Sequence, residues 1–197
     1  MKPLFSIAKR VPANQKRIVF AEADHYKILK AVQVVRDEGI AKPILLGDKN
    51  RIERIAEDNF IDISEMQIVD HLHEHEDKRD EFGDMLWRRR QRRGLSQYDA
   101  RRLMRDRNYF GAMMVQSGMA DAMISGLTRK YSQPIKPALE IIDVMPGVSK
   151  VAGLYIMVTK RGPFFFADTT MNVDPTSQEL VDIAILTANT VKQFNIT

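Results

Sequence analysis

The chain has 197 residues, 44% of them hydrophobic and 28% charged, which is the balance of an ordinary globular protein with a substantial core. It contains no cysteine, which excludes disulfides, zinc–thiolate sites and a thiol nucleophile and fits a cytoplasmic location. The formal charge of +4 is too small to indicate a nucleic-acid partner, and no apolar run is long enough to cross a membrane.

The start of the chain alternates short apolar runs with an amphipathic stretch. Residues 17–21 are rich in β formers and predict a buried strand, and residues 43–47 predict a second one. Between them, apolar residues recur at helical spacing over 28–35, with Asp24 as the expected N-cap and Gly39 ending the pattern. Strand, helix and strand within about 30 residues predict a βαβ unit and therefore a parallel sheet.

The middle of the chain continues this α/β pattern. The expected elements are, in order, a helix over 51–59, a strand over 66–69, a polar connection over 71–78, a helix over 79–93 ending at Gly94, a helix starting at Ser96, a helix over 112–117, a strand over 121–126 and a helix starting near Pro137. Asp99 lies three residues after Ser96, which is close to a capping box.

The pattern changes at Met145-Pro146-Gly147, the best candidate for a domain boundary. Residues 151–158 and 164–167 predict a β-hairpin, and residues 177–194 predict a helix capped by Thr176 or Ser177.

We therefore expect an α/β fold in two parts. Residues 1–145 are predicted to form a parallel-sheet, three-layer αβα domain. Residues 146–197 are predicted to begin a second α/β subdomain, which is truncated because the chain stops just after its helix without a clear cap.

Polar residues follow two of the predicted strands. Glu22 and Asp24 follow the first strand, at the sheet edge where open parallel sheets bind ligands, although capping is the favoured role for Asp24. The segment 125–130, Ser-Gly-Leu-Thr-Arg-Lys, follows the fourth strand, which is expected to be buried, and its glycine lets backbone N–H groups approach an anion. The spacing of a P-loop is absent, so this signal is weak on its own.

Two other clusters have a less specific chemistry. Nine arginines lie between Arg88 and Arg107; most are expected to be solvated or paired, and one or two facing a cleft could bind phosphate. Alternate histidines at 71, 73 and 75 have the spacing of a metal chelate, but a mobile polar loop is favoured, so no metal site is predicted.

The order of segments resembles the phosphate acetyl/butyryltransferase family over nearly the whole chain. The similarity lies in residues 17–24 (RIVFAEAD), 37–47, 120–126 (ADAMISG), 136–142, 146–153, 166–168, 174–176 and 180–184. Within that family, the stretch from Trp87 to Gly94 and the segment 126–131 (GLTRKY) resemble the C-terminal acetyltransferase-like domain of hybrid, NADP-dependent malic enzymes.

The resemblance implies two α/β subdomains around a cleft that holds CoA and phosphate, and a homodimer. It also identifies two departures: Lys136 replaces an arginine before a proline, and residues 129–132 replace a threonine-rich segment. Because lysine lacks the bidentate fork of arginine, the first interpretation is a regulatory domain that senses acetyl-CoA or CoA. The malic-enzyme half, with its NADP and divalent metal, would then be absent here. The alternative is a fragment of an active phosphate acetyl/butyryltransferase.

The catalytic motif of the family lies beyond Thr197, so the resemblance implies no catalytic residue in this chain and predicts an inactive fragment. A nucleic-acid-binding role for the arginines is a third hypothesis, which nothing else supports. The predicted ligand site is a set of six residues that converge on the phosphates of a CoA-type ligand. They are Arg90, which matches a family arginine, Ser125, Gly126, Thr128, Arg129 and Lys136, the last expected at a helix start before Pro137.

Overall fold

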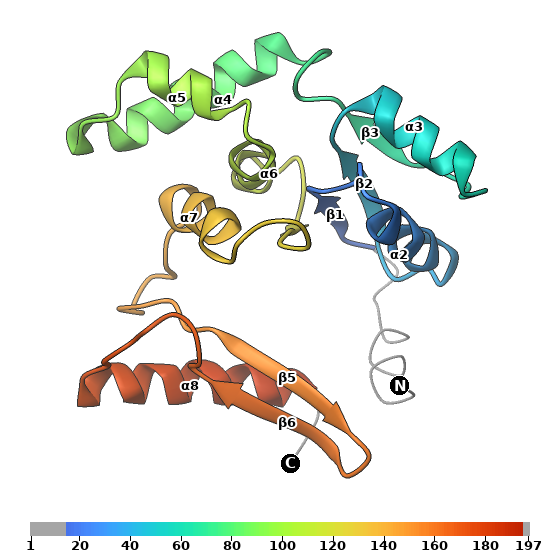
Figure 1. Cartoon of the computed structure of the whole chain (residues 1–197). Helices are drawn as coiled ribbons and strands as arrows, with labels where there is room; N and C mark the ends of the chain where they lie inside the picture. Colours follow the sequence, from blue (N-terminus) through green and yellow to red (C-terminus); the bar gives the residue numbers. More distant parts are fainter. Residues whose placement is uncertain (1–14, 195–197) are drawn as a thin grey trace. The chain divides into compact units, whose positions relative to one another are not determined.

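The computed structural model describes residues 15–194, which form two compact units, 15–143 and 144–194 (Figure 1). Each unit has its own sheet, four-stranded in the first and two-stranded in the second.

The first unit is built on a parallel sheet with the order β3-β2-β1-β4. Its strands are β1 (Arg17–Phe20), β2 (Lys42–Leu46), β3 (Gln67–Val69) and β4 (Ala122–Ile124). Its helices are α2 (Tyr26–Asp37), α3 (Lys49–Asp58), α4 (Glu76–Arg90), the 3-10 turn η1 (Gln91–Arg93), α5 (Gln97–Leu103), α6 (Arg107–Gln116) and α7 (Ser132–Ile141). All three strand pairings are parallel, as the βαβ pattern predicted.

The two faces of this sheet belong to two separate hydrophobic clusters. Successive strand residues point to opposite faces, so Val19 and Leu46 face α6 while Phe20 and Leu45 face α2 and α3. Behind α6, the same cluster extends to α4, α5 and α7 through residues such as Phe82. The result is the predicted α/β fold with helices on both faces of a parallel sheet.

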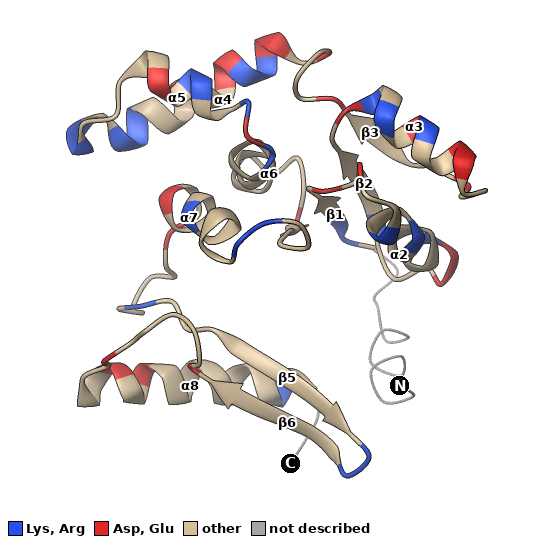
Figure 2. Ribbon diagram, viewed as in Figure 1, with Lys and Arg blue, Asp and Glu red and all other residues tan. Residues whose placement is uncertain are grey.

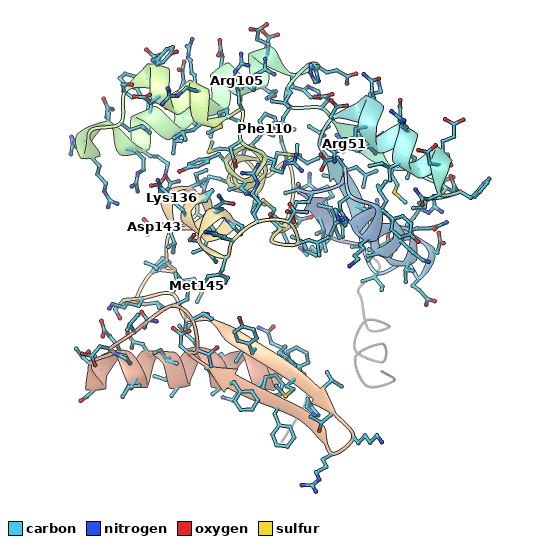
Figure 3. All side chains as sticks on the ribbon, viewed as in Figure 1. Arg51, Arg105, Phe110, Lys136, Asp143 and Met145 are labelled. Atoms are coloured by element: carbon cyan, nitrogen blue, oxygen red, sulfur yellow. The ribbon has the colours of Figure 1, made fainter. Side chains whose placement is uncertain are left out.

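Helix α6 packs very closely on the sheet. A Cβ atom placed on Gly111 would lie 2.6 Å from the sulfur of Met123 on β4, well inside van der Waals contact. Glycine therefore brings the backbone of α6 against the sheet, and Phe110 beside it is 1% exposed (Figure 3).

The second unit contains an antiparallel hairpin and one helix. Strands β5 (Leu154–Thr159) and β6 (Gly162–Ala167) pair along their whole length, and α8 (Ser177–Gln193) follows. Of the two expected caps of α8, Thr176 is the N-cap, and it forms a capping box: Glu179 N–H donates to the Thr176 hydroxyl and Thr176 N–H donates to the Glu179 carboxylate. Figure 2 shows both strands free of charged residues and a basic turn between them.

Three local predictions were wrong. The helix α2 is capped by the His25 side chain instead of Asp24, which is held by arginines. Strand β4 is an edge strand of the described sheet, and its outer residues Ala122 and Ile124 are exposed, so it is not a buried strand. His71 is 2% exposed against Phe110 and does not belong to a mobile polar loop.

Within residues 15–194, no helix combines the length and the apolar character that a membrane crossing requires.

Candidate functional site

The strand order places a topological switch point between β1 and β4. The chain runs outward from β1 to β2 and β3, then returns to add β4 on the other side of β1. Open parallel sheets bind ligands beyond the carboxyl ends of the strands at such a point. The residues after β1 and after β4 therefore form the candidate site.

The carboxylate of Glu22 closes the gap between these two strand ends. It accepts hydrogen bonds from the backbone N–H groups of Gly126, Leu127 and Thr128 at 2.9, 2.7 and 2.9 Å, and from the Thr128 hydroxyl. Three successive N–H groups that converge on one anion form a nest. The backbone amides after β4 therefore bind an internal carboxylate, that of Glu22.

Glu22 is 1% exposed and stays ionised. Burial acts to raise its pKa, but the hydrogen bonds from Thr128, Leu127 and Gly126 outweigh burial and lower the pKa to about 2. The loop after β4 is therefore fixed by a charge-assisted clamp.

Two arginines from different helices share the next acid, Asp24. Arg107, at the start of α6, binds it through both ends of the guanidinium, with Nη1–Oδ1 at 2.5 Å and Nη2–Oδ2 at 3.2 Å. Arg51 on α3 reaches the same carboxylate at 3.5 Å. Burial acts to raise the pKa of Asp24, but the hydrogen bond and charge of Arg107 and the charge of Arg51 lower it.

The remaining loop residues are held by the N-terminus of α6. Ser125 Oγ donates to Asn108 Oδ1 at 2.6 Å, and Arg129 lies 3.6 Å from the Asp106 carboxylate. Asp106 also caps α6 by accepting from the N–H of Asn108 at 2.8 Å. Of these cations, Arg51 and Arg129 are the accessible ones, with side chains 66% and 40% exposed against 21% for Arg107.

Arg90 contacts a different set of side chains. Its guanidinium lies 3.6 Å from Glu140 on α7, and Tyr109 on α6 donates to the same carboxylate at 2.6 Å. Burial, then the hydrogen bond and charge of Glu140, raise the pKa of Tyr109 above its ordinary range. Arg90 thus ties α4 to α6 and α7, a structural role that the sequence did not predict.

Lys136 does not precede a helix start, which corrects the prediction. Helix α7 begins at Ser132, so Pro137 lies inside the helix and Lys136 is an exposed residue of its middle (Figure 3). The reason is Pro134, which occupies the first turn, where backbone N–H groups have no acceptor in the helix and proline is tolerated.

The three alternate histidines have unrelated environments. His71 binds the backbone carbonyl of Arg105 through Nε2 at 3.2 Å, and His73 binds Asp70 at 3.0 Å. His75 is the N-cap residue of α4 without a side-chain hydrogen bond. Residues 15–194 contain no group of three or more acids and histidines that could hold a metal ion.

Sequence reasoning missed Arg51 and Arg107 and the true role of Glu22. Arg107 belongs to the arginine-rich stretch 88–107, in which one or two phosphate-binding residues were expected, but only the fold shows that Arg107 lies at the sheet edge. A signal was available for Glu22, because an acid directly after a buried strand lies at the edge where helix starts and loop amides gather.

Comparisons with known proteins agree with this architecture. The family profile described as phosphate acetyl/butaryl transferase matches residues 2–197. The phosphate acetyltransferase of Helicobacter pylori is 36% identical over 191 residues, covering 97% of this chain and 36% of the relative. That of Bacillus subtilis is 34% identical over 197 residues, covering 100% of this chain and 60% of the relative.

Solved structures give the same result. The EutD phosphotransacetylase of Staphylococcus aureus matches with a TM-score of 0.87 and 27% identity, over 99% of this chain and 58% of that chain. A phosphotransacetylase of Streptococcus pyogenes matches with a TM-score of 0.87 and 30% identity, over 99% and 59%. The chain therefore spans about three fifths or less of the length of these proteins.

Proposed function

Since the chain belongs to the phosphate acetyl/butaryl transferase family, we propose that it carries part of the phosphate- and CoA-binding site of a phosphate acetyltransferase. The reaction is the exchange of an acetyl group between CoA and phosphate, in which the CoA thiolate attacks acetyl phosphate. The match of the family over nearly the whole chain is the observation that carries this proposal.

The chemistry of the sheet edge supports it. Both substrates carry phosphate groups, and guanidinium groups bind phosphate through two parallel hydrogen bonds. Arg51 lies 3.5 Å from Asp24 and Arg129 lies 3.6 Å from Asp106, and both guanidinium groups have further donors that remain exposed. Asp24 and Asp106 hold these arginines in place before a ligand arrives, which reduces the entropy lost on binding.

The proposed ligand residues are Arg51 and Arg129, with Lys136 as an exposed cation on α7. Ser125, Gly126 and Thr128 shape the loop that presents Arg129. Arg90 supports the site indirectly, because its contact with Glu140 fixes α4 against α7.

The test is isothermal titration of acetyl-CoA into the 197-residue chain, with Arg129→Gln and Lys136→Gln as variants and Arg54→Gln as the matched control. Arg54 lies on α3 with its side chain 83% exposed. Loss of one charge-assisted hydrogen bond weakens binding roughly tenfold. If Arg129→Gln and Lys136→Gln bind as tightly as Arg54→Gln, these side chains do not form the site.

The second candidate is a regulatory domain of a hybrid malic enzyme that binds acetyl-CoA without transferring its acetyl group. It is favoured by the departures at Lys136 and at 129–132, and by the filling of the loop amides by Glu22. Incubation of the full-length protein with acetyl phosphate and CoA separates the two. Formation of acetyl-CoA that depends on Arg129 supports the transferase, and binding without turnover in the full-length protein supports the regulatory domain.

Self-association is a further part of the proposal. The hairpin exposes a face formed by Tyr155, Met157, Phe164 and Phe166, each 45–54% exposed. Exposed apolar patches of this kind mark protein–protein contacts. Light scattering over a range of concentrations tests it, and a strict monomer throughout would contradict it.

A further inference from the structure

A second basic pocket lies between α4 and α5, built from residues other than those of the sheet edge. Its volume is about 440 Å³, and its walls include Arg79 and Asp80 from α4 and Tyr98, Arg102 and Arg105 from the α5 region. Figure 2 shows the concentration of charged residues on these two helices, and Figure 3 marks Arg105 beside them. Neither the family match nor the proposed function gives this pocket a role.

Arg79 is a buried cation without an acidic partner. The residue is 8% exposed, and its Nη1 donates to the backbone carbonyls of His71 and Leu72 at 2.5 and 2.9 Å. No carboxylate of residues 15–194 forms an ion pair with it. A buried charge normally needs a counter-charge, and the hydrogen bonds of Arg79 to the described residues all come from Nη1, which leaves the donors of Nε and Nη2 available.

Arg105 supplies a second unpaired guanidinium. Its side chain lines the pocket, is exposed, and makes no ion pair or hydrogen bond with the described residues. The other two arginines of the wall are compensated, because Arg101 binds Asp84 at 2.9 and 3.0 Å and Arg102 binds Asp99 at 3.0 Å. Of the two lining carboxylates, that of Asp80 pairs with Arg101 at 3.4 Å, which leaves only Glu76 against the two unpaired cations, so the pocket keeps a net positive charge.

His71 fixes the guanidinium of Arg79 and the backbone at Arg105, while the Arg105 side chain itself stays free to reach a ligand. The Nε2–H of His71 donates to the Arg105 carbonyl at 3.2 Å, and the His71 carbonyl accepts from Arg79. His71 is 2% exposed and packs on Phe110, with ring centroids 5.5 Å apart. A rigid second layer of this kind is what a preorganised anion site needs.

An aromatic ring lies at the same pocket. Tyr98 is 74% exposed, and the Arg102 guanidinium lies 5.9 Å from its ring centroid. An exposed tyrosine beside guanidinium groups provides a platform on which a planar base stacks. The cations select a phosphate, and the ring selects a flat organic group attached to it.

We propose that the α4–α5 pocket binds a nucleoside monophosphate, with its phosphate against Arg79 and Arg105 and its base against Tyr98. The site is separate from the sheet edge, so its occupation leaves Arg51 and Arg129 free. A ligand here would lock α4 to α5, and α4 also carries Arg90 and its contact with α7.

The probe is AMP, titrated calorimetrically into the 197-residue chain, with adenosine as the ligand that lacks the phosphate. Arg105→Gln is expected to weaken AMP binding at least tenfold, and Tyr98→Ala roughly fivefold to tenfold. Both side chains are exposed, so neither change is expected to unfold the protein. Arg54→Gln on α3 is the matched control and should bind AMP as the wild type does.

Arg129→Gln distinguishes this site from the sheet edge. The proposal expects AMP affinity to be unchanged in Arg129→Gln, whatever happens to acetyl-CoA affinity. The proposal is overturned if AMP binding survives Arg105→Gln, if adenosine binds as tightly as AMP, or if Arg129→Gln alone weakens AMP. Absence of AMP binding at millimolar concentration overturns it as well.

Discussion

The two units of this chain differ sharply in what they bury. The sheet unit, residues 15–143, contains nearly all the buried apolar side chains of the described chain. In residues 144–194, Ile183 is the one apolar side chain that is buried, at 6% exposure. Both units nevertheless contain regular helices and strands, so the presence of secondary structure does not by itself mean that a unit has a buried core.

The difference lies in how each unit covers the faces of its sheet. The sheet unit covers both faces of its sheet with helices. The hairpin leaves one face bare and places Phe165 and Phe194 in contact near α8, with ring centroids 5.5 Å apart. Since hydrophobic burial is the main source of stability, the sheet unit should dominate the free energy of unfolding.

The largest expected effect comes from a pair of matched phenylalanines. Phe110→Ala removes a ring that is 1% exposed and should lower the free energy of unfolding by about 3–5 kcal/mol. Phe164→Ala removes a ring that is 47% exposed and should change it by less than about 1 kcal/mol. Urea denaturation followed by circular dichroism measures both. Equal costs would mean that the hairpin face is covered in solution.

The next effect concerns the clamp in the sheet unit. Glu22→Gln places an amide opposite three backbone N–H donors and should cost about 1.5–3 kcal/mol. The pKa of Glu22 is lowered from 4.5 to about 2, so its contribution is complete above pH 4.5 and is lost as the pH falls towards 2.

The difference in stability between wild type and Glu22→Gln should therefore shrink between pH 4.5 and pH 2. Taking the difference removes the common contributions of other acids. Glu81→Gln, whose carboxylate is 53% exposed beside Lys78, is the control and should cost no more than about 1 kcal/mol. A difference that does not vary with pH would contradict the clamp.

A smaller effect is expected for the hydroxyl that joins α6 to α7. Tyr109→Phe removes the 2.6 Å hydrogen bond to Glu140 and leaves that carboxylate with Arg90 at 3.6 Å. The expected cost is about 1–2 kcal/mol, measured by urea denaturation. Tyr98→Phe, at an exposed position, is the control. If the two variants are equally stable, the network contributes nothing.

The smallest effect compares helix caps across the two units. Thr176→Ala removes the capping box of α8, and Ser96→Ala removes the hydroxyl that accepts from Asp99 N–H at 3.0 Å. Each should cost about 0.5–2 kcal/mol, as caps do in general. Because α8 has little tertiary burial, Thr176→Ala should also reduce helical circular dichroism, whereas Ser96→Ala should not. The opposite pattern would reverse the contrast between the units.

Much of the fold could be predicted from the sequence because apolar periodicity is a local signal. The strands at 17–20 and 42–46 and the cap at Thr176 follow directly from it. The edge position of β4 could not be predicted in this way, since strand order depends on contacts far apart in the chain.

The candidate site was harder for the same reason. The loop at 126–128 was recognised as an anion-binding backbone, but its partner Glu22 lies more than 100 residues away. Lys136 was misplaced because Pro137 was interpreted as the start of the helix, whereas α7 already begins at Ser132 and has Pro134 in its first turn. The sequence therefore predicts the role of a residue where that role depends on neighbours in the chain, and fails where the role depends on a partner that is distant in the chain.

The separation of Glu22 from Gly126 by 104 residues has a consequence for the time course of folding. A contact between such distant residues closes a large loop, and long loops make folding slow. The nest at 126–128 cannot take its final shape before β4 has joined β1. We expect the amides of this loop to become protected from hydrogen exchange late in refolding, after those of β1 and β2.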